Sequence, residues 1–269
     1  MNQADKARAF LALHQQQQPL LLPNAWNAAT ARVFQEAGFP AVGTTSAGIA
    51  FSMGYPDGEV MPFSEMMYVV RRLVAAVDIP VSADMVAGFA HTSDQLAHHI
   101  NEVIDAGAVG INFEDSRPDG TLLNADDNQL RLALIRHVAR QREIPLVINA
   151  RVDTYWLTGG KGDLDETLRR AKAYVRAGAD CLFVPLLTAE ADIARLRAEV
   201  NVPINLLATG LTLDRVRAAR IERLSLGSGP FSGSLGQLKQ AADTALLTGD
   251  LTGFGNSPVS YATLMRWFG

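Results

Sequence analysis

Carboxylates and an arginine in this sequence stand where short apolar runs end. Asp84 and Glu114 close two such runs, and Arg151 lies near the end of a third. Carboxylates that face one another repel, so a cluster stays ionised at neutral pH only beside a cation or with shifted pKa values. Oxygen ligands without any H-x-x-H or C-x-x-C pair favour Mg²⁺ or Mn²⁺ over zinc. If these runs converge in the fold, they predict a site for a hard cation.

Two further groups of residues belong with this set. Asp57 stands in the loop G-Y-P-D-G-E, and the N–H groups of Ala47 and Gly48 beside Ser46 are expected to form an anion-binding nest. Mg²⁺ keeps several waters, so one direct carboxylate from Asp84, with Glu114 and Asp57 acting through water, suffices to hold it. Arg151 is then expected to grip a substrate carboxylate with two parallel hydrogen bonds.

Eight β-rich runs must position these residues, and segments with helical periodicity alternate with them. The runs cover residues 20–23, 41–46, 81–85, 110–114, 146–152, 181–185, 204–207 and 223–226, and clear helical segments cover 63–77, 93–106, 126–141 and 164–177. Strands that alternate with helices predict a parallel sheet buried on both faces. A chain of 269 residues gives about 34 residues per unit, the allotment of a (β/α)8 TIM-type barrel.

An internal repeat supports the barrel. Gly38, Gly107 and Gly178 each follow an expected helix and precede an expected strand, and they stand 69 and 71 residues apart, about two units each time. A dinucleotide-binding sheet is disfavoured because no G-x-G-x-x-G follows the first strand. We therefore predict one barrel domain over 1–269, with 250–269 as a C-terminal extension. Active sites of such barrels lie at the carboxyl ends of the strands.

Composition excludes several classes of protein. The chain is 48% hydrophobic and 19% charged, which is too apolar for disorder, and no apolar run reaches the length of a membrane span. The net charge of −4 without basic blocks gives no footprint for nucleic acid. Cys181 is the one cysteine and cannot form an internal disulfide, and the first residues do not resemble a signal peptide. We expect a cytoplasmic protein without membrane or nucleic-acid partners.

Five motifs in order give the sequence a resemblance to a known family. They are T-T-S-A-G, G-Y-P-D-G-E, S-A-D-x-x-A-G-F, G-I-N-F-E-D-S and I-N-A-R-V-D-T, within a stretch that runs from Pro23 to Ser228. The chain resembles the isocitrate lyase/phosphoenolpyruvate mutase superfamily. That resemblance implies a (β/α)8 enzyme that uses Mg²⁺ to cleave or form C–C or P–C bonds next to a 2-oxo acid, through a metal-stabilised enolpyruvate intermediate. It also implies a homo-oligomer, a tetramer or dimer, with exchanged terminal helices.

The resemblance assigns roles to the candidate residues. Asp84 and Glu114 would hold the metal, with Asp57 acting through water. The 2-oxo acid would be bound by residues from three strand ends, namely Ser46, Ala47, Gly48, Asp84 and Arg151. The candidate catalytic residues are Arg151, Asp57 and Glu114. A Schiff-base mechanism is disfavoured independently, because none of the four lysines ends a strand.

Two departures from the family pattern narrow the expected activity. The third strand reads Asp84-Met85-Val86 where the family has D-x-D or D-x-E, and a missing carboxylate is expected to weaken or reposition the metal. The stretch 115–124 lacks both the K-K-C-G-H loop of the tricarboxylate lyases and the Lys-x-Asn loop of the phosphonate mutases. We therefore expect a Mg²⁺-dependent lyase or decarboxylase acting on a small 2-oxo dicarboxylic acid, with oxaloacetate as the leading substrate.

Several alternatives stay open at this point. The reaction could be P–C cleavage of a phosphonopyruvate-like substrate, since Leu226-Gly227-Ser228-Gly229 occupies a place where many barrels bind phosphate, or C–C cleavage like that of (methyl)isocitrate lyase. A barrel that binds oxo acids without turning them over is the alternative from another class. Arg151 could form ion pairs with Glu114 or Asp153 instead of binding substrate. We expect Asp115 to make structural hydrogen bonds and Trp156 to pack at a barrel end.

Overall fold

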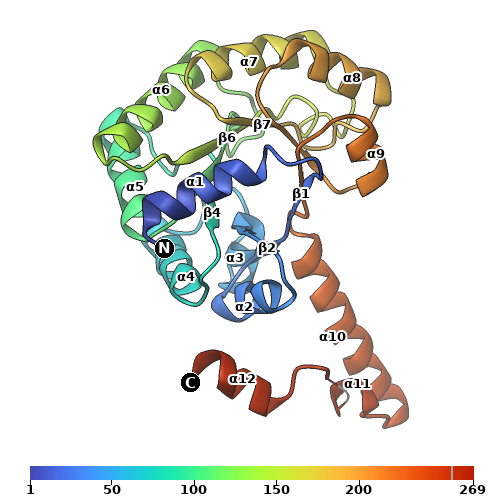
Figure 1. Cartoon of the computed structure of the whole chain (residues 1–269). Coiled ribbons are helices and arrows are strands. Elements are labelled where there is room, and N and C mark those ends of the chain that lie inside the picture. The colour runs from blue at the N-terminus through green and yellow to red at the C-terminus, as the bar shows by residue number, and fades with distance from the viewer. Residues whose placement is uncertain (256) are drawn as a thin grey trace.

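Nine parallel strands form one sheet that closes into a barrel, with helices outside it (Figure 1). The computed structural model describes residues 1–255 and 257–269. The strand order is β1-β9-β8-β7-β6-β5-β4-β3-β2. The strands are β1 (Leu20–Leu22), β2 (Asn24–Ala25), β3 (Val42–Thr44), β4 (Val81–Asp84), β5 (Gly110–Glu114), β6 (Val147–Arg151), β7 (Cys181–Phe183), β8 (Ile204–Leu207) and β9 (Arg223–Ser225).

The two ends of this sheet are consecutive pieces of one chain segment. Only Pro23 separates β1 from β2, and β1 pairs with β9 while β2 pairs with β3. A proline has no N–H to donate to a sheet, so the first strand, expected over 20–23, ends before that residue, and β2 is a further short strand beyond the expected range. The eight expected strands are thus all present, and the prediction of a TIM-type barrel is confirmed.

The four helices expected from the sequence are present, and each begins and ends within two residues of its expected range. In chain order, the helices of the described residues are α1 (Gln3–Leu13), α2 (Ala28–Glu36), α3 (Ser46–Ser52), α4 (Phe63–Ala75), α5 (Ser93–Asp105), α6 (Ala125–Gln141), α7 (Leu164–Arg176), α8 (Glu190–Glu199), α9 (Leu213–Ala218), α10 (Gly229–Thr248), α11 (Thr252–Gly255) and α12 (Tyr261–Phe268). The repeated glycines Gly38, Gly107 and Gly178 follow α2, α5 and α7 with φ of 90°, 89° and 104°. A left-handed residue at this point ends a helix and favours glycine, which explains the repeat.

Helix α1 closes the amino ends of the strands. Its Phe10 is fully buried and packs with Leu20, Val109 and Val147, which lie at or next to the starts of β1, β5 and β6. The first residue of β5 is Gly110, and a Cβ there would lie 2.7 Å from the Phe10 ring. Glycine is therefore required at this position for the helix to seat against the barrel, which leaves the carboxyl ends as the open end.

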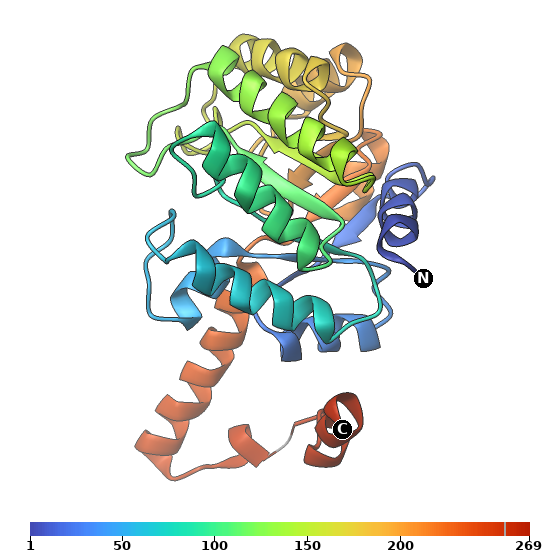
Figure 2. The same ribbon diagram turned by 90° about the vertical axis from the view of Figure 1, so that its left-hand side faces the viewer.

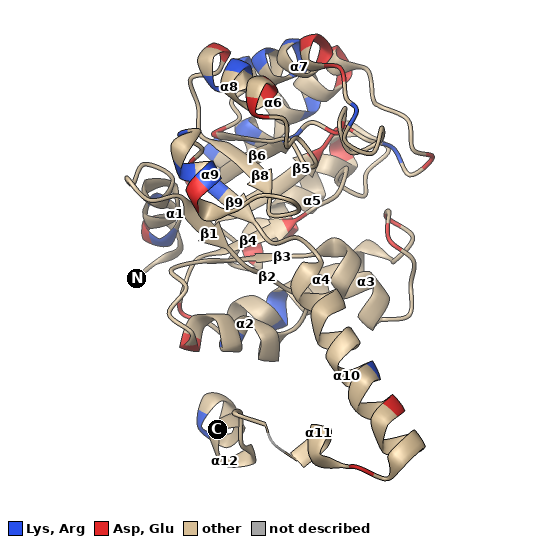
Figure 3. Cartoon of the chain, turned by 90° about the vertical axis from the view of Figure 1, so that its right-hand side faces the viewer, with Lys and Arg blue, Asp and Glu red and all other residues tan. Residues whose placement is uncertain are grey.

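Helices α10, α11 and α12 leave the barrel as an arm (Figures 1 and 2). The arm carries few charged residues (Figure 3), and many of its apolar side chains are exposed, among them Leu246, Leu247 and Tyr261. Of the predicted extension 250–269, residue 256 lies outside the described residues. None of the helices in the described part of the chain combines the length and apolarity that a membrane crossing requires.

Candidate active site

A cavity of about 300 Å³ opens at the carboxyl ends of the strands. Most of the residues proposed from the sequence line it, namely Ser46, Ala47, Asp57, Asp84, Glu114 and Arg151. They come from the ends of β4, β5 and β6, from the start of α3 and from the loop that follows α3. Parallel strands of a closed barrel bring their carboxyl ends to one rim, so residues far apart in sequence meet here.

Gly48 does not line this cavity. Its N–H donates to Oγ1 of Thr45 at 3.2 Å, and a Cβ at this position would lie 2.7 Å from Thr45 Cγ2 and 3.1 Å from Trp26 Cβ. The N–H of Ser46 donates to Oδ2 of Asp84 at 3.1 Å. One of the two N–H groups of the expected anion nest, that of Gly48, therefore has a partner within the protein, as does the neighbouring N–H of Ser46, and Gly48 serves close packing.

Arg151 forms ion pairs with two carboxylates. Its Nη1 lies 2.9 Å from Oε2 of Glu114, and its Nε lies 2.6 Å from Oδ1 of Asp153. Burial disfavours the charged guanidinium, but Glu114, Asp153 and Asp84 outweigh it and raise the pKa of Arg151. The sequence left these ion pairs open as an alternative to substrate binding. A guanidinium has five N–H donors, so a substrate carboxylate can join the two acids at this group.

Glu114 lies in an environment that favours its protonated form. Burial raises the pKa of Glu114 to about 8, with Asp153 and Asp84 adding to the effect and Arg151 opposing it. The hydroxyl of Ser116 lies 2.8 Å from Oε1 of Glu114 and 2.6 Å from Oδ2 of Asp153. One hydroxyl proton serves only one of these oxygens, so both contacts are hydrogen bonds when one carboxyl group carries a proton. The two short contacts of the Ser116 hydroxyl thus agree with the raised pKa of Glu114.

Asp84 and Asp57 complete the acidic wall of the cavity. Asp84 is half-buried and forms no ion pair within the described residues, while its own N–H donates to Oγ1 of Thr44 at 2.8 Å. Burial raises the pKa of Asp57, and the charge of Asp84 adds to this effect. Asp84 thus faces the cavity without an ion pair of its own, although its charge acts on Arg151, Arg223 and Asp57.

The residues fit a divalent cation that keeps most of its waters. Among residues 1–255 and 257–269, no three His, Cys, Asp or Glu side chains lie close enough to ligate one ion together. Mg²⁺ is commonly bound by one or two carboxylates plus water and substrate oxygens. Asp84 forms no ion pair within the described residues, and Asp57 and Glu114 line the same cavity. This donor set suits direct ligation by Asp84 and contact with the two other acids through water.

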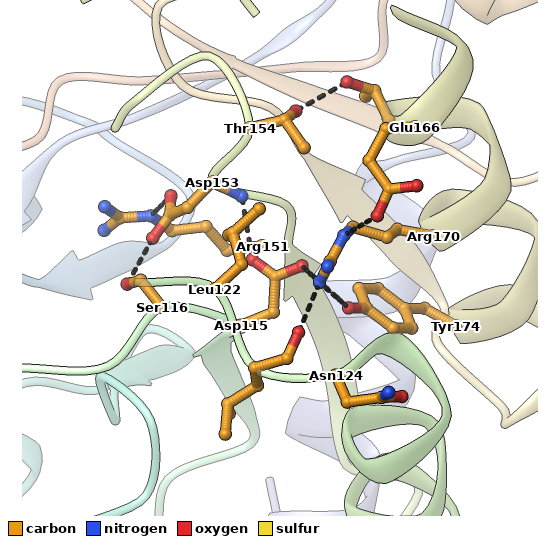
Figure 4. A network of polar contacts seen from close by, with 12 residues as sticks. Asp115, Ser116, Leu122, Asn124, Arg151, Asp153, Thr154, Glu166, Arg170 and Tyr174 are labelled. Atoms are coloured by element: carbon orange, nitrogen blue, oxygen red, sulfur yellow. Dashed lines mark hydrogen bonds and ion pairs between the residues drawn. The ribbon is translucent and has the colours of Figure 1, made fainter. Parts of the chain in front are cut away.

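A buried network behind the cavity holds Asp153 and hence Arg151 (Figure 4). Oδ1 of Asp115 accepts the N–H of Asp153 at 2.9 Å. Its Oδ2 accepts a hydrogen bond from Nη1 of Arg170 at 3.0 Å and another from the hydroxyl of Tyr174 at 2.7 Å. Arg170 and Tyr174 lie on α7, so the network joins that helix to the ends of β5 and β6. The expected structural role of Asp115 is confirmed.

Val86 contributes strain to the cavity wall. It is a β-branched residue with φ of 48°, in the left-handed region that such residues rarely adopt. Its carbonyl oxygen accepts the N–H of Glu114 at 2.9 Å, so the strained conformation is held by the neighbouring strand. Strain of this kind costs of order 1–3 kcal/mol and gathers at functional sites. This is the position at which the family pattern has an acid.

Sequence reasoning missed several lining residues, of which Trp156 and Asn112 are the most informative. Trp156 was expected to pack at a barrel end, and it lies at the carboxyl end, where it also lines the cavity with its ring 5.0 Å from the Arg151 guanidinium carbon. The expectation did not include this contact, because the spacing does not reveal that the loop after β6 folds back over Arg151. Asn112 stands two residues before Glu114, and this inward-facing spacing was the available signal.

Fold and site together define an α/β-barrel protein with an acidic cavity and a half-buried arginine at the carboxyl ends of its strands. The sequence profile of the phosphoenolpyruvate phosphomutase family matches residues 10–246, and the chain belongs to this family. The 2-methylisocitrate lyase of Escherichia coli K12 is 29% identical over 231 residues, which are 80% of this chain and 75% of that protein.

Solved structures agree with the fold. A crystal structure described as a lyase/mutase from Burkholderia cenocepacia J2315 has a TM-score of 0.91 and 36% identity, covering 99% of this chain and 96% of that one. A phosphonopyruvate hydrolase solved with oxalate and Mg²⁺ has a TM-score of 0.85 over 99% of this chain and 95% of that one, at 20% identity. The second likeness shows the fold alone.

Proposed function

We propose that the protein is a Mg²⁺-dependent lyase or decarboxylase that acts on a small 2-oxo dicarboxylic acid, with oxaloacetate as the leading substrate. The observation that carries this proposal is the cavity in which Asp57, Asp84 and Glu114 face Arg151. Such a cavity offers a cation site beside a guanidinium, which is what a dianionic oxo acid requires. Carbon–carbon cleavage by the E. coli relative supports the reaction class.

Asp84, with Glu114 and Asp57 through water, would hold the ion. When bound, Mg²⁺ supplies a Lewis acid that stabilises negative charge developing at the 2-oxo oxygen. The phosphonopyruvate hydrolase structure with oxalate and Mg²⁺ supports this choice of metal for the fold. The missing acid at Val86 leaves Asp84 without the second carboxylate of the family pattern.

The chain's own residues would bind and orient the substrate. The guanidinium of Arg151, fixed by Asp153 at 2.6 Å, binds the carboxylate next to the 2-oxo group. Trp156 covers that guanidinium and limits the access of water. In decarboxylation the C3–C4 bond breaks and carbon dioxide leaves. The electron pair of the broken bond stays on C3 and is delocalised onto the 2-oxo oxygen. A proton from solvent then adds to C3 and gives pyruvate.

Cleavage of a P–C bond is the alternative that a specific observation favours. Gly227 and Ser228 line the cavity directly before α10, and Ser228 makes no side-chain cap to that helix. Helix starts of this kind bind phosphate in many barrels. The N–H of Gly227 already donates to Oδ1 of Asn24 at 2.9 Å, which reduces what this corner can offer a phosphonate. (Methyl)isocitrate lyase-like C–C cleavage is less favoured, because the stretch 115–124 lacks Cys, Lys and His.

The test is pyruvate release from oxaloacetate with Mg²⁺ or Mn²⁺, measured above the rate of the same metal without protein. Wild type is expected to be active, while Asp84→Ala and Arg151→Ala are expected to lose about 100-fold or more, as expected when a buried charged partner is removed. Asp94→Ala on the exposed first turn of α5 is the matched control and should keep full activity.

Each outcome of this assay selects one function. If wild type and both variants are equally inactive while oxalate still binds, the protein is a non-catalytic oxo-acid-binding barrel and the proposal fails. Free phosphate released from phosphonopyruvate, without pyruvate release from oxaloacetate, selects P–C cleavage instead.

We also propose that the protein is a cytoplasmic homo-oligomer, a tetramer or dimer, in which the arm exchanges between subunits. Exposed apolar side chains run along the whole arm, namely Leu235, Leu238, Leu246, Leu247, Leu251, Phe254, Tyr261, Leu264, Met265 and Phe268. Large apolar surfaces of this kind mark association sites. Light scattering is expected to give a multiple of the 29.0 kDa chain mass, and a monomer would contradict the proposal.

A further inference from the structure

A layer of amide and hydroxyl side chains lies inside the barrel between the cavity and α1. It consists of Asn112 on β5, Asn149 on β6, Asn205 on β8, and Arg223 and Ser225 on β9, all of them buried. Asn112 and Ser225 also line the cavity. This layer, which we call the amide layer, therefore forms part of the cavity floor. None of its members was among the candidate residues taken from the sequence.

Arg223 is a fully buried cation that has no carboxylate partner within the described residues. Its Nη2 donates to Oδ1 of Asn112 and its Nε to Oγ of Ser225, both at 3.3 Å, and its Nη1 has no hydrogen-bond partner. Burial lowers the pKa of Arg223 to about 10, so the guanidinium remains charged at neutral pH. An unpaired buried charge is costly, and a functional reason is needed for keeping one.

The side-chain amide of Asn112 has a fixed orientation. Its Oδ1 accepts from Nη2 of Arg223 and from Nδ2 of Asn149, the latter at 2.7 Å. Turning the amide over would set its NH₂ group against two donors, so the network selects one of the two orientations. Nδ2 of Asn112 donates to no atom of the described residues, and the residue lines the cavity. The amide therefore presents its N–H donors to whatever occupies the cavity.

We propose that Asn112 is a substrate-binding residue that donates to an anionic oxygen of the bound oxo acid, and that Arg223 is the positioning residue that aims it. This inference rests on the proposed function of the cavity. Asn112 pairs in register with Asp84 and stands two residues before Glu114, so its donor lies beside the expected ion and on the floor of the cavity. An oxygen that contacts the ion can reach this donor as well.

The charge of Arg223 strengthens such a donor. Hydrogen bonds polarise one another, so an amide whose oxygen accepts from a guanidinium donates more strongly from its nitrogen. The charge of Arg223 also favours an anion above it, because its hydrogen-bond partners are neutral and the carboxylate whose charge acts on it, Asp84, stands apart in the cavity wall. The floor thus selects ligands with an anionic or strongly polarised oxygen, such as a carboxylate or enolate, over a neutral alcohol.

The experiment measures oxalate binding by calorimetry at saturating Mg²⁺, with melting temperature as the second readout. In Asn112→Asp the new carboxylate still accepts from Arg223 and Asn149, so the protein should fold with a melting temperature near that of wild type. The carboxylate replaces the donor and repels the ligand, so oxalate affinity should fall by about tenfold to 100-fold, the usual range for a charged hydrogen bond.

Asn205→Asp is the matched control. Asn205 pairs in register with Arg223 and is fully buried, but it does not line the cavity. The substitution adds the same charge to the same layer and leaves the Asn112 donor in place, but it sets that charge beside Arg223 through Ser225, so oxalate affinity should fall several-fold, as in Arg223→Met, and by less than in Asn112→Asp. An equal loss in both variants would show that charge alone matters and would overturn the assignment of Asn112.

Arg223→Met separates positioning from a structural role. Replacing an unpaired buried charge by an apolar side chain of similar size is often neutral or stabilising. The melting temperature should therefore be unchanged or higher while oxalate affinity falls several-fold. A lower melting temperature with unchanged affinity would overturn the role of Arg223. Wild-type protein that binds no oxalate contradicts the proposed function and this inference together, whereas binding that survives in Asn112→Asp contradicts this inference alone.

Discussion

The upper and lower parts of the barrel interior hold one arginine each, in opposite surroundings: Arg151 is half-buried and Arg223 is fully buried. Arg151 at the upper rim forms ion pairs with Glu114 and Asp153 at 2.9 and 2.6 Å. Arg223 in the amide layer has neutral partners at 3.3 Å. The upper part is therefore a set of paired charges, and the lower part is a neutral network around one unpaired charge.

This difference separates two ways of building a binding site. At the rim, a ligand must join or replace the acids that already contact Arg151. Ligand binding there therefore depends on whether these acids are protonated and on whether the cation is bound. In the amide layer, the partners of Arg223 do not titrate near neutrality, so the donors keep one orientation. The rim can respond to its ligands, while the floor is fixed in advance.

The largest effect on ligand binding and activity is expected at the rim, from Arg151→Met. The substitution leaves Glu114 and Asp153 buried without a cation, and oxalate affinity and pyruvate release should fall by about 100-fold or more. Arg151→Lys restores the charge without the paired donors and should recover part of the loss. Oxalate binding by Arg151→Met at wild-type affinity would show that the rim arginine does not contact the ligand.

Arg170→Met tests the network that supports the rim. Asp115 is fully buried, and the substitution removes its ion pair at 3.0 Å, so the free energy of unfolding should fall by about 3–5 kcal/mol. Arg169→Met is the matched control on the same helix, because Arg169 is exposed and pairs with Glu166 at the surface; its effect should stay below about 0.5 kcal/mol. Urea unfolding measures the free energy of unfolding of both variants. Equal losses would show that the buried network does not stabilise the protein.

His14 tests the lower end of the barrel through pH. Burial, with the charge of Arg223 adding to it, lowers the pKa of His14 from 6.5 to about 4. The unfolded chain therefore binds a proton that the folded chain does not, and stability is lost as pH falls from 6.5 towards 4, by up to about 3 kcal/mol. His14→Asn keeps a donor for the Phe10 carbonyl oxygen and should show a flatter profile of unfolding free energy. His98→Asn, at an exposed site, should follow wild type.

A parallel pH profile for wild type and His14→Asn would show that burial does not keep His14 neutral in the folded protein, which would contradict the lowered pKa of this residue.

The smallest effect is expected from Val86→Asp, which restores an acid at the rim. Mg²⁺ affinity should rise by about tenfold, the scale of effects from residues next to metal ligands. Val86→Asn is the control, since Asn also tolerates the left-handed backbone better than Val but adds no charge. Asn should raise the melting temperature without raising Mg²⁺ affinity. Equal Mg²⁺ affinity in the two variants would contradict the role assigned to this position.

The sequence predicted the barrel because buried parallel strands are apolar throughout and because Gly38, Gly107 and Gly178 repeat at helix ends. It also predicted which acids meet, since Asp84 and Glu114 close their strands. The family motifs carried the rest of the candidate site, although Gly48 turned out to pack against Trp26 and Thr45 instead of lining the cavity.

The remainder depends on side-chain partners that spacing alone does not reveal. Arg151 could be read as a substrate ligand or as an ion-pair partner, and the ion pairs are present. Asn112 carries no charge, so its importance emerges only from the two donors that fix its amide. The left-handed conformation of Val86 runs against the preference of its residue type, and local propensity cannot predict it.

A crystal structure of the protein grown with Mg²⁺ and oxalate tests the central claim most directly. We expect the ion at about 2.0–2.1 Å from a carboxylate oxygen of Asp84, with oxalate between Arg151 and the amide nitrogen of Asn112. Oxalate bound away from this cavity, or a metal ion that does not contact Asp84, would contradict it.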